Sequence, residues 1–299
     1  MITFKSKLLL LILAMTSYSA WSQTVVPIIW PFAMGSMQAN YVRAIAEDAN
    51  SRQTKYQFVF EHRPGAGGSI AMNHALNSQR LTIVSNSSSV FTRPLYYPDS
   101  YDISQFSPIL TQVVGQPVAI VSKKYSSMAE LKKQTKLSIG MINGSITQLL
   151  AESLSKRLPG IDVVFVPYQG TTDVVRDVVA GHIDLGIEFA ADLQTWMADK
   201  RVNVIGITGR QTYPGFPAFV DQGYPEFENL VVNYFFVVST NVSESVRQEL
   251  NEILRMSNRS AKVVNLYRRD FAIPVDHDLQ QSEQLWRSLQ VYWQTFFKK

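Results

Sequence analysis

Three short loops carry the residues of this chain that are best suited to hold a ligand. They span residues 32–36, 63–69 and 143–147, and each combines glycine with small polar side chains just before a predicted helix. Glycine lets a ligand approach the backbone closely. A helix N-terminus adds unpaired N–H groups and a partial positive charge, so it can hold a carboxylate without a basic side chain. The candidate ligand-binding residues in these loops and at the first residue of the helix after loop 32–36 are Phe32, Gly35, Ser36, Met37, Gly65, Ala66, Gly67, Asn143, Ser145 and Thr147.

Each loop taken singly is equally well explained as an ordinary connection between a strand and a helix. Together they suggest a site in which a carboxylate lies between residues 35–36 and residues 144–145. Ser36, Ser145 and Thr147 would then supply hydroxyl donors. Neither loop contains a lysine, so binding there is expected not to depend on a lysine side chain.

Ser87 and Ser88 follow a predicted strand over residues 81–85 and form a second candidate site with the glycine loop at 65–68. Ser87 also keeps a hydrolase open as an alternative. However, the chain has no G-x-S-x-G motif, and no general base lies near this serine run in the sequence.

Several other chemistries find no support in the sequence. The run Gly65-Ala66-Gly67 would need glycine or alanine at position 70 to match a dinucleotide fingerprint, and that residue is Ile70. The four histidines are scattered without metal-ligand spacing, and there is no cysteine. We therefore expect no cofactor and no metal. Asp184 and Glu188 leave a paired-carboxylate catalyst conceivable.

The first 22 residues have the pattern of a secretory signal peptide. Lys5 and Lys7 precede an apolar run over residues 8–15, and Ala20 and Ser22 fit a small-x-small cleavage site. We expect cleavage after Ser22 and a periplasmic protein. Removing those two lysines leaves 26 of 28 basic residues against 24 acidic ones, a net charge of +2. That balance gives no electrostatic footprint for nucleic acid.

Short apolar strands alternate with helical patterns along the mature chain, which predicts α/β units with largely parallel sheets. The pattern restarts after residue 122. We therefore predict a first domain from residues 24–122 plus 227–299 and a second from 123–226. A final helix is predicted over residues 278–297, with its aromatic stripe packed onto the first domain rather than around a ligand.

Several segments in order along the chain resemble the Bug/TctC family, the periplasmic receptors of tripartite tricarboxylate transporters. The most specific, E-H-R-P-G-A-G-G at residues 61–68, is similar to that family's E-N-R-P-G-A-G-G. The others lie at residues 30–36, 92–96, 166–170 and 181–184. The resemblance implies a type II periplasmic-binding-protein-like fold, with two α/β domains around a central cleft. It also adds Gly170 and Glu188 to the candidate binding residues.

The sequence departs from that family at four places that bear on the pocket. Met34 stands where the family often has glycine, Gln38 where it often has an acidic residue, and Glu188 where it has aspartate. Residues 239–243 replace its P-A-G-T-P loop. The resemblance implies a solute-binding protein without catalysis, and we expect it to be a monomer. It would capture a small carboxylate-type solute for the membrane subunits of a tripartite transporter. A ligand sensor that reports to a membrane signalling protein stays open as an alternative.

Overall fold

Two five-stranded mixed sheets form the framework of the molecule. The computed structural model describes residues 23–210, 215–270 and 272–298, except the side chains of residues 194 and 195, so the predicted signal peptide lies outside the described residues. The first sheet has the strand order β2-β1-β3-β10-β4. Its strands are β1 (Thr24–Trp30), β2 (Tyr56–His62), β3 (Ile83–Ser87), β4 (Phe106–Gln116) and β10 (Val232–Ser239). The pairs of β1 are parallel and those of β10 antiparallel.

The second sheet repeats this plan in the order β7-β6-β8-β5-β9. Its strands are β5 (Val118–Ser122), β6 (Lys136–Met141), β7 (Asp162–Pro167), β8 (Leu185–Phe189) and β9 (Asn203–Ile207). Here β6 pairs in parallel with β7 and β8, and β5 pairs antiparallel with β8 and β9. The predicted two-domain α/β fold is confirmed, with one reversed strand inside each sheet.

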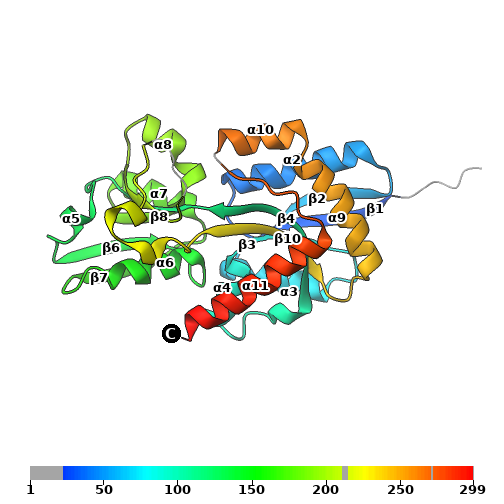
Figure 1. Ribbon diagram of the computed structural model, residues 1–299, viewed down its shortest axis with the longest axis horizontal. Coiled ribbons are helices and arrows are strands. Elements are labelled where there is room, and N and C mark those ends of the chain that lie inside the picture. Colours follow the sequence, from blue (N-terminus) through cyan, green and yellow to red (C-terminus); the bar gives the residue numbers. More distant parts are fainter. Residues whose placement is uncertain (1–22, 211–214, 271, 299) are drawn as a thin grey trace, which may run out of the picture.

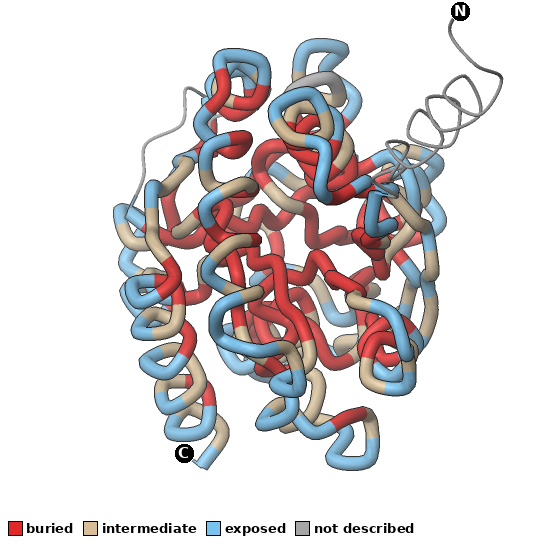
Figure 2. The backbone as a smooth tube through the Cα atoms, turned by 90° about the vertical axis from the view of Figure 1, so that its right-hand side faces the viewer, coloured by how far each residue is buried: buried red, intermediate tan, exposed pale blue. Residues whose placement is uncertain are grey.

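Helices cover both sheets, and the inner strands are buried between them (Figure 1, Figure 2). The first sheet carries α2 (Met37–Arg52), α3 (Ser69–Asn77), α4 (Ser89–Tyr96), α9 (Glu244–Asn258), α10 (Ala261–Arg269) and α11 (Leu279–Phe297). The second carries α5 (Met128–Leu131), α6 (Ile146–Ser155), α7 (Thr171–Ala180) and α8 (Gln194–Ala198). No helix in the described ranges is long and apolar enough to cross a membrane.

The C-terminal helix α11 packs on the first sheet, as its aromatic stripe predicts. Trp286 and Trp293 are 4% and 1% exposed. The Trp286 ring lies 4.5 Å from that of Phe91 in α4 and 5.5 Å from that of Phe235 in β10, measured between centroids. Apolar contact therefore fixes α4, whose N-terminus faces the other lobe.

The chain crosses between the lobes where β4 runs into β5 and again between β9 and β10. Residues 118–122 were expected in the first domain, but they form β5 and pair with β8 and β9 in the second sheet. All five residues of β5 are buried. A strand that is apolar on both faces fits the interior of either sheet, so the sequence pattern places it on the wrong side of the crossing. The rest of the domain division stays a prediction.

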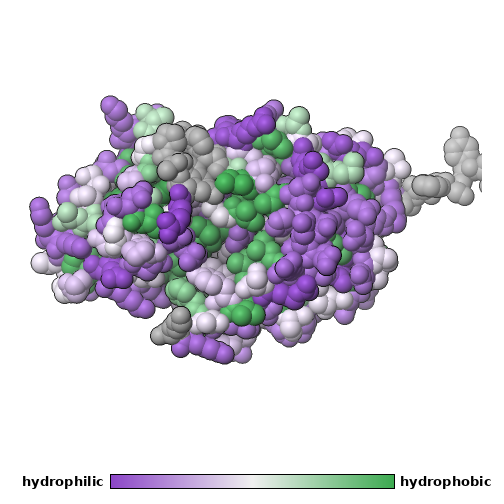
Figure 3. All heavy atoms as spheres, in the orientation of Figure 1, coloured by the Kyte–Doolittle hydropathy of each residue, from purple (hydrophilic) through white to green (hydrophobic). Residues whose placement is uncertain are grey.

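Figure 3 shows mainly hydrophilic residues over the outer helices and apolar residues gathered between the two lobes. The region between the lobes is also where residues from both sheets meet in an enclosed cavity.

Candidate functional site

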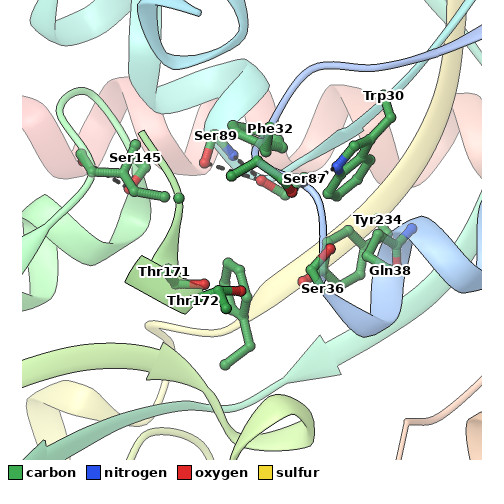
Figure 4. Close-up of a pocket in the computed structure, with 14 residues that line it drawn as sticks. Trp30, Phe32, Ser36, Gln38, Ser87, Ser89, Ser145, Thr171, Thr172 and Tyr234 are labelled. Carbon is green, nitrogen blue, oxygen red and sulfur yellow. Dashed lines mark hydrogen bonds between the residues drawn. The ribbon is translucent and has the colours of Figure 1, made fainter. Parts of the chain in front are cut away.

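A cavity lies between the two sheets, at the carboxyl ends of their parallel strands (Figure 4). Eight lining residues come from the first lobe: Trp30, Phe32, Ala33, Ser36, Gln38, Ser87, Ser89 and Tyr234. Six come from the second: Ile142, Ser145, Gly170, Thr171, Thr172 and Phe189. In open α/β sheets, ligands bind in crevices at this end of the strands.

The N-terminus of α7 opens onto this cavity without a side-chain cap. Its N-cap residue, Gly170, has no side chain to accept from the first-turn N–H groups. The neighbouring helices differ: Ser36 accepts from Ala39 N in α2, and Ser145 accepts from Thr147 N in α6. A helix of 10 residues with uncapped N–H groups offers partial positive charge to an anion.

The serine hydroxyls around the cavity are not equally free. Ser145 Oγ donates to Ile142 O at 2.9 Å and accepts from Thr147 N at 3.1 Å, so its bonds are used within its own loop. Ser87 Oγ donates to Ser89 Oγ at 3.0 Å and accepts from Ser89 N. The Ser89 hydroxyl is thus an acceptor inside the protein and keeps its own proton for the cavity.

The described lining of the cavity contains no lysine, arginine, histidine or carboxylate side chain. Its single titratable group is Tyr234; burial, with the charges of Asp192 and Glu188, raises the pKa of this phenol well above its usual range. It therefore stays neutral. None of these residues could serve Ser87 as a general base, and no observation favours the hydrolase alternative.

A second cavity adjoins the first and shares Thr172 with it. Glu188 and Asp192 line it, together with Met37 and Arg201. Asp192 Oδ1 accepts a hydrogen bond from Met37 N, the first N–H of α2, at 2.7 Å. The anion position at this helix end, which the sequence assigns to a solute, is thus already taken by the protein's own carboxylate.

Burial raises the pKa of both Asp192 and Glu188. The pKa of Asp192 rises to about 7, mainly because of burial and further because of the charge of Asp270, while the hydrogen bond from Met37 N–H opposes the rise. Burial and the charge of Asp192 together raise the pKa of Glu188 well above its usual range. Glu188 accepts from Phe189 N at 2.7 Å and is 1% exposed.

The structure gathers eight of the predicted site residues at these two cavities. Five line the first cavity: Phe32, Ser36, Ser87, Ser145 and Gly170. Gly35, Met37 and Glu188 line the second.

The other predicted residues lie elsewhere or have internal roles. Ser88 Oγ accepts from Asn233 N at 2.9 Å, behind the cavity wall. Thr147 Oγ1 accepts from Ile142 N at 2.8 Å and is fully buried. Asn143 contributes its carbonyl to the lobe contact described below. The loop with Gly65, Ala66 and Gly67 lies outside both cavities, and Ala66 lines a separate surface hollow.

Nine of the residues that line the first cavity are not among the site residues predicted from the sequence. Thr171 and Thr172 follow Gly170 directly, so a helix start after a glycine is the signal that could have found them. Gln38 stands at a noted departure from the family. The remaining six are Trp30, Ala33, Ser89, Ile142, Phe189 and Tyr234.

The two lobes contact each other around the cavity, so the cleft between them is closed. Thr92 Oγ1 donates to Gly144 O at 2.8 Å, and Arg93 Nη1 donates to Asn143 O at 3.0 Å. A Cβ on Gly170 would lie 2.4 Å from the Cβ of Ala33. Glycine is therefore needed at position 170 for the lobes to come this close.

Solved structures with the same fold include bacterial binding proteins. The periplasmic binding protein BugD is 21% identical, covers 92% of this chain and 96% of its own, and superimposes with a TM-score of 0.80. A Rhodopseudomonas palustris protein solved with adipate is 20% identical, with 92% and 96% coverage and a TM-score of 0.78. MatC of the same species, solved with malate, is 18% identical, with 92% and 99% coverage and a TM-score of 0.78.

The sequence itself assigns the family. The model of the TctC family, described as the tripartite tricarboxylate transporter family receptor, matches residues 42–298. This range includes every strand of the second sheet and all the helix N-termini at the cavity except that of α2. The family resemblance carried by the glycine loop and its companion motifs is confirmed. This chain belongs to the TctC family of tripartite tricarboxylate transporter receptors, which are solute-binding proteins.

Proposed function

We propose that this receptor captures a small organic carboxylate in the periplasm and delivers it to the membrane subunits of a tripartite transporter. The observation that carries the proposal is the uncapped N-terminus of α7, which opens onto an enclosed cavity without a charged lining side chain. Backbone N–H groups and hydroxyls then hold the anion. Favourable partly buried helix ends contribute up to about 2 kcal/mol to such binding.

The rest of the lining suits an apolar or flat solute body. Four aromatic side chains line the cavity: Trp30, Phe32, Phe189 and Tyr234. Small-molecule sites of this kind combine an apolar wall with a few placed polar groups. Two structural relatives were solved with the dicarboxylates adipate and malate, which supports the choice of a carboxylic acid.

The proposed location rests on the sequence of residues 1–22 and on the fold shared with a periplasmic binding protein. N-terminal sequencing of the exported protein tests it. A chain that begins near Gln23 is expected, and retention of Met1 in the soluble pool would contradict it.

A thermal-shift screen of mono-, di- and hydroxycarboxylic acids, followed by calorimetry, tests the function. A ligand at 100 times its Kd stabilises the native state by about 2.7 kcal/mol. Thr172→Asp places a negative charge at the α7 N-terminus inside the cavity, so we expect it to abolish binding of every acid in the panel.

The matched control is Thr54→Asp, which adds the same charge at an exposed residue. It should leave binding unchanged. The proposal fails if no carboxylate stabilises the wild type, or if the Thr172→Asp variant binds acids as tightly as the control.

A further inference from the structure

Gln38 has a buried amide oxygen with no hydrogen-bond partner. This side chain extends from the first turn of α2, is 4% exposed and lines the cavity. Its Nε2 donates to Gln112 Oε1 at 2.8 Å, whereas its own Oε1, like Gln112 Nε2, has no partner among the described residues. Buried polar atoms are nearly always hydrogen-bonded, so an unpaired one calls for an explanation.

The arrangement leaves the oxygen, rather than the nitrogen, for a ligand. Gln112 lies in β4 and is fully buried outside the lining of the cavity, so the bond that it accepts directs Nε2 away from the cavity. Figure 4 shows Gln38 and Tyr234 on the side of the cavity away from Ser145 and Thr171. The unpaired acceptor and the uncapped end of α7 therefore face a solute from different sides.

An acceptor in this position discriminates between solutes by their chemistry. A hydroxyl, ammonium or amide N–H can donate to Gln38 Oε1, but an ionised carboxylate has only acceptor atoms. If a solute placed a second carboxylate at Gln38 Oε1, both the carboxylate and Oε1 would be desolvated without a hydrogen bond. A site that hydrogen-bonds a solute group rejects analogues that lack this group.

We propose that Gln38 is a specificity residue that selects a solute with a carboxylate at one end and a hydrogen-bond donor at the other, as in a hydroxy or amino acid. This inference rests on the proposed function, because it takes the anion to lie at α7. Gln38 Oε1 accepts from the donor group, while the four aromatic side chains contact the carbon body between the two ends.

Calorimetry with hexanoate, 6-hydroxyhexanoate, 6-aminohexanoate and adipate tests the inference. On the wild type, the hydroxy acid should bind about tenfold more tightly than hexanoate, which corresponds to about 1.4 kcal/mol. Gln38→Met removes the acceptor and should abolish this ratio while hexanoate still binds. Gln38→Glu should shift the preference toward 6-aminohexanoate, because its ammonium would pair with the new carboxylate.

The matched control is Gln116→Met, which alters another buried glutamine of β4 that does not line the cavity. It should leave all the ratios at their wild-type values, and circular dichroism should report the native fold for each variant. Tightest binding of adipate to the wild type, or an unchanged ratio in both Gln38 variants, overturns the inference. Absence of binding by all four acids would count against the proposed function itself.

Discussion

Serine hydroxyls that look alike in the sequence have different tasks in the structure. Ser36 and Ser145 cap the helices that follow them, so their oxygens are engaged with backbone N–H groups. Ser89 begins α4 at the cavity and is only an acceptor from Ser87 within the protein. A free hydroxyl proton, rather than the residue type, makes a serine a candidate donor for an anion.

Ser89→Ala should therefore mainly weaken ligand binding, whereas Ser145→Ala should mainly lower stability. The first removes a donor to a charged group, worth roughly 1.5–3 kcal/mol, and should weaken carboxylate binding at least about tenfold. The second removes an N-cap and should lower the free energy of unfolding by about 1 kcal/mol, with ligand affinity nearly unchanged. Urea unfolding and calorimetry separate the two quantities, and a loss of affinity confined to Ser145→Ala would contradict this assignment.

At the scale of elements, the contact between Asp192 and the N-terminus of α2 joins the two lobes. Asp192 lies in the 3₁₀ turn Ala190–Leu193 that follows β8, and it accepts from Met37 N. Glu188, Asp270 and Tyr234 lie near it, and Arg201 lines the same cavity. The contact therefore couples closure of the lobes to the charge of a half-buried acid.

Asp192 should make the protein less stable as the pH rises from about 4 to about 7. Its folded pKa is raised to about 7 from 3.8, so in this range the folded state holds a proton that the unfolded state has released. The free energy of unfolding then falls with rising pH, and the full loss is present above the folded pKa. In Asp192→Asn this contribution is absent, while the Asn oxygen still accepts from Met37 N.

Urea unfolding at pH 4.5, 6, 7 and 8 measures this difference. The variant should be more stable relative to the wild type at pH 8 than at pH 4.5. The exposed Asp199→Asn is the control and should show a constant difference. A constant difference for Asp192→Asn as well would show that this carboxyl does not carry the effect.

At the scale of the whole molecule, the described structure is a closed cleft. Backbone carbonyls of the loop at residues 143–144 accept from Thr92 and Arg93 across the cleft. Opening would separate these contacts, with β4–β5 and the segment before β10 as the connections about which the lobes move. Gly170 and Ala33 also approach each other closely across the cleft.

Gly170→Ala should prevent full closure without harming the fold. The backbone of Gly170 is extended, with φ at −162°, so alanine is allowed there, yet its Cβ would collide with Ala33. We expect at least tenfold weaker ligand binding and a larger radius of gyration by small-angle scattering with ligand present. Unliganded stability should not change. Adding Ala33→Gly removes the colliding atom and should restore affinity, and failure of this rescue would rule out the steric explanation.

The local elements around the site follow from the sequence alone. The helix predicted over residues 278–297 corresponds to α11, and the strand predicted over residues 81–85 overlaps β3. Caps, glycines and apolar periodicity act over a few neighbouring residues, so a pattern in the sequence is enough to locate them. The motifs at residues 61–68 and 166–170 likewise identify the family without coordinates.

Tertiary structure alone decided how these elements share one cavity. No strand is predicted over 106–116 or 232–239, yet β4 forms one edge of the first sheet, and β10 lies beside it and brings Tyr234 to the site. Strand pairing joins residues far apart in the chain, and no local pattern records the partner. The use of Asp192 at the α2 N-terminus and the unpaired oxygen of Gln38 depend on burial and on contacts between lobes. The sequence determined which residues could hold an anion, and packing decided which of them remain free to do so.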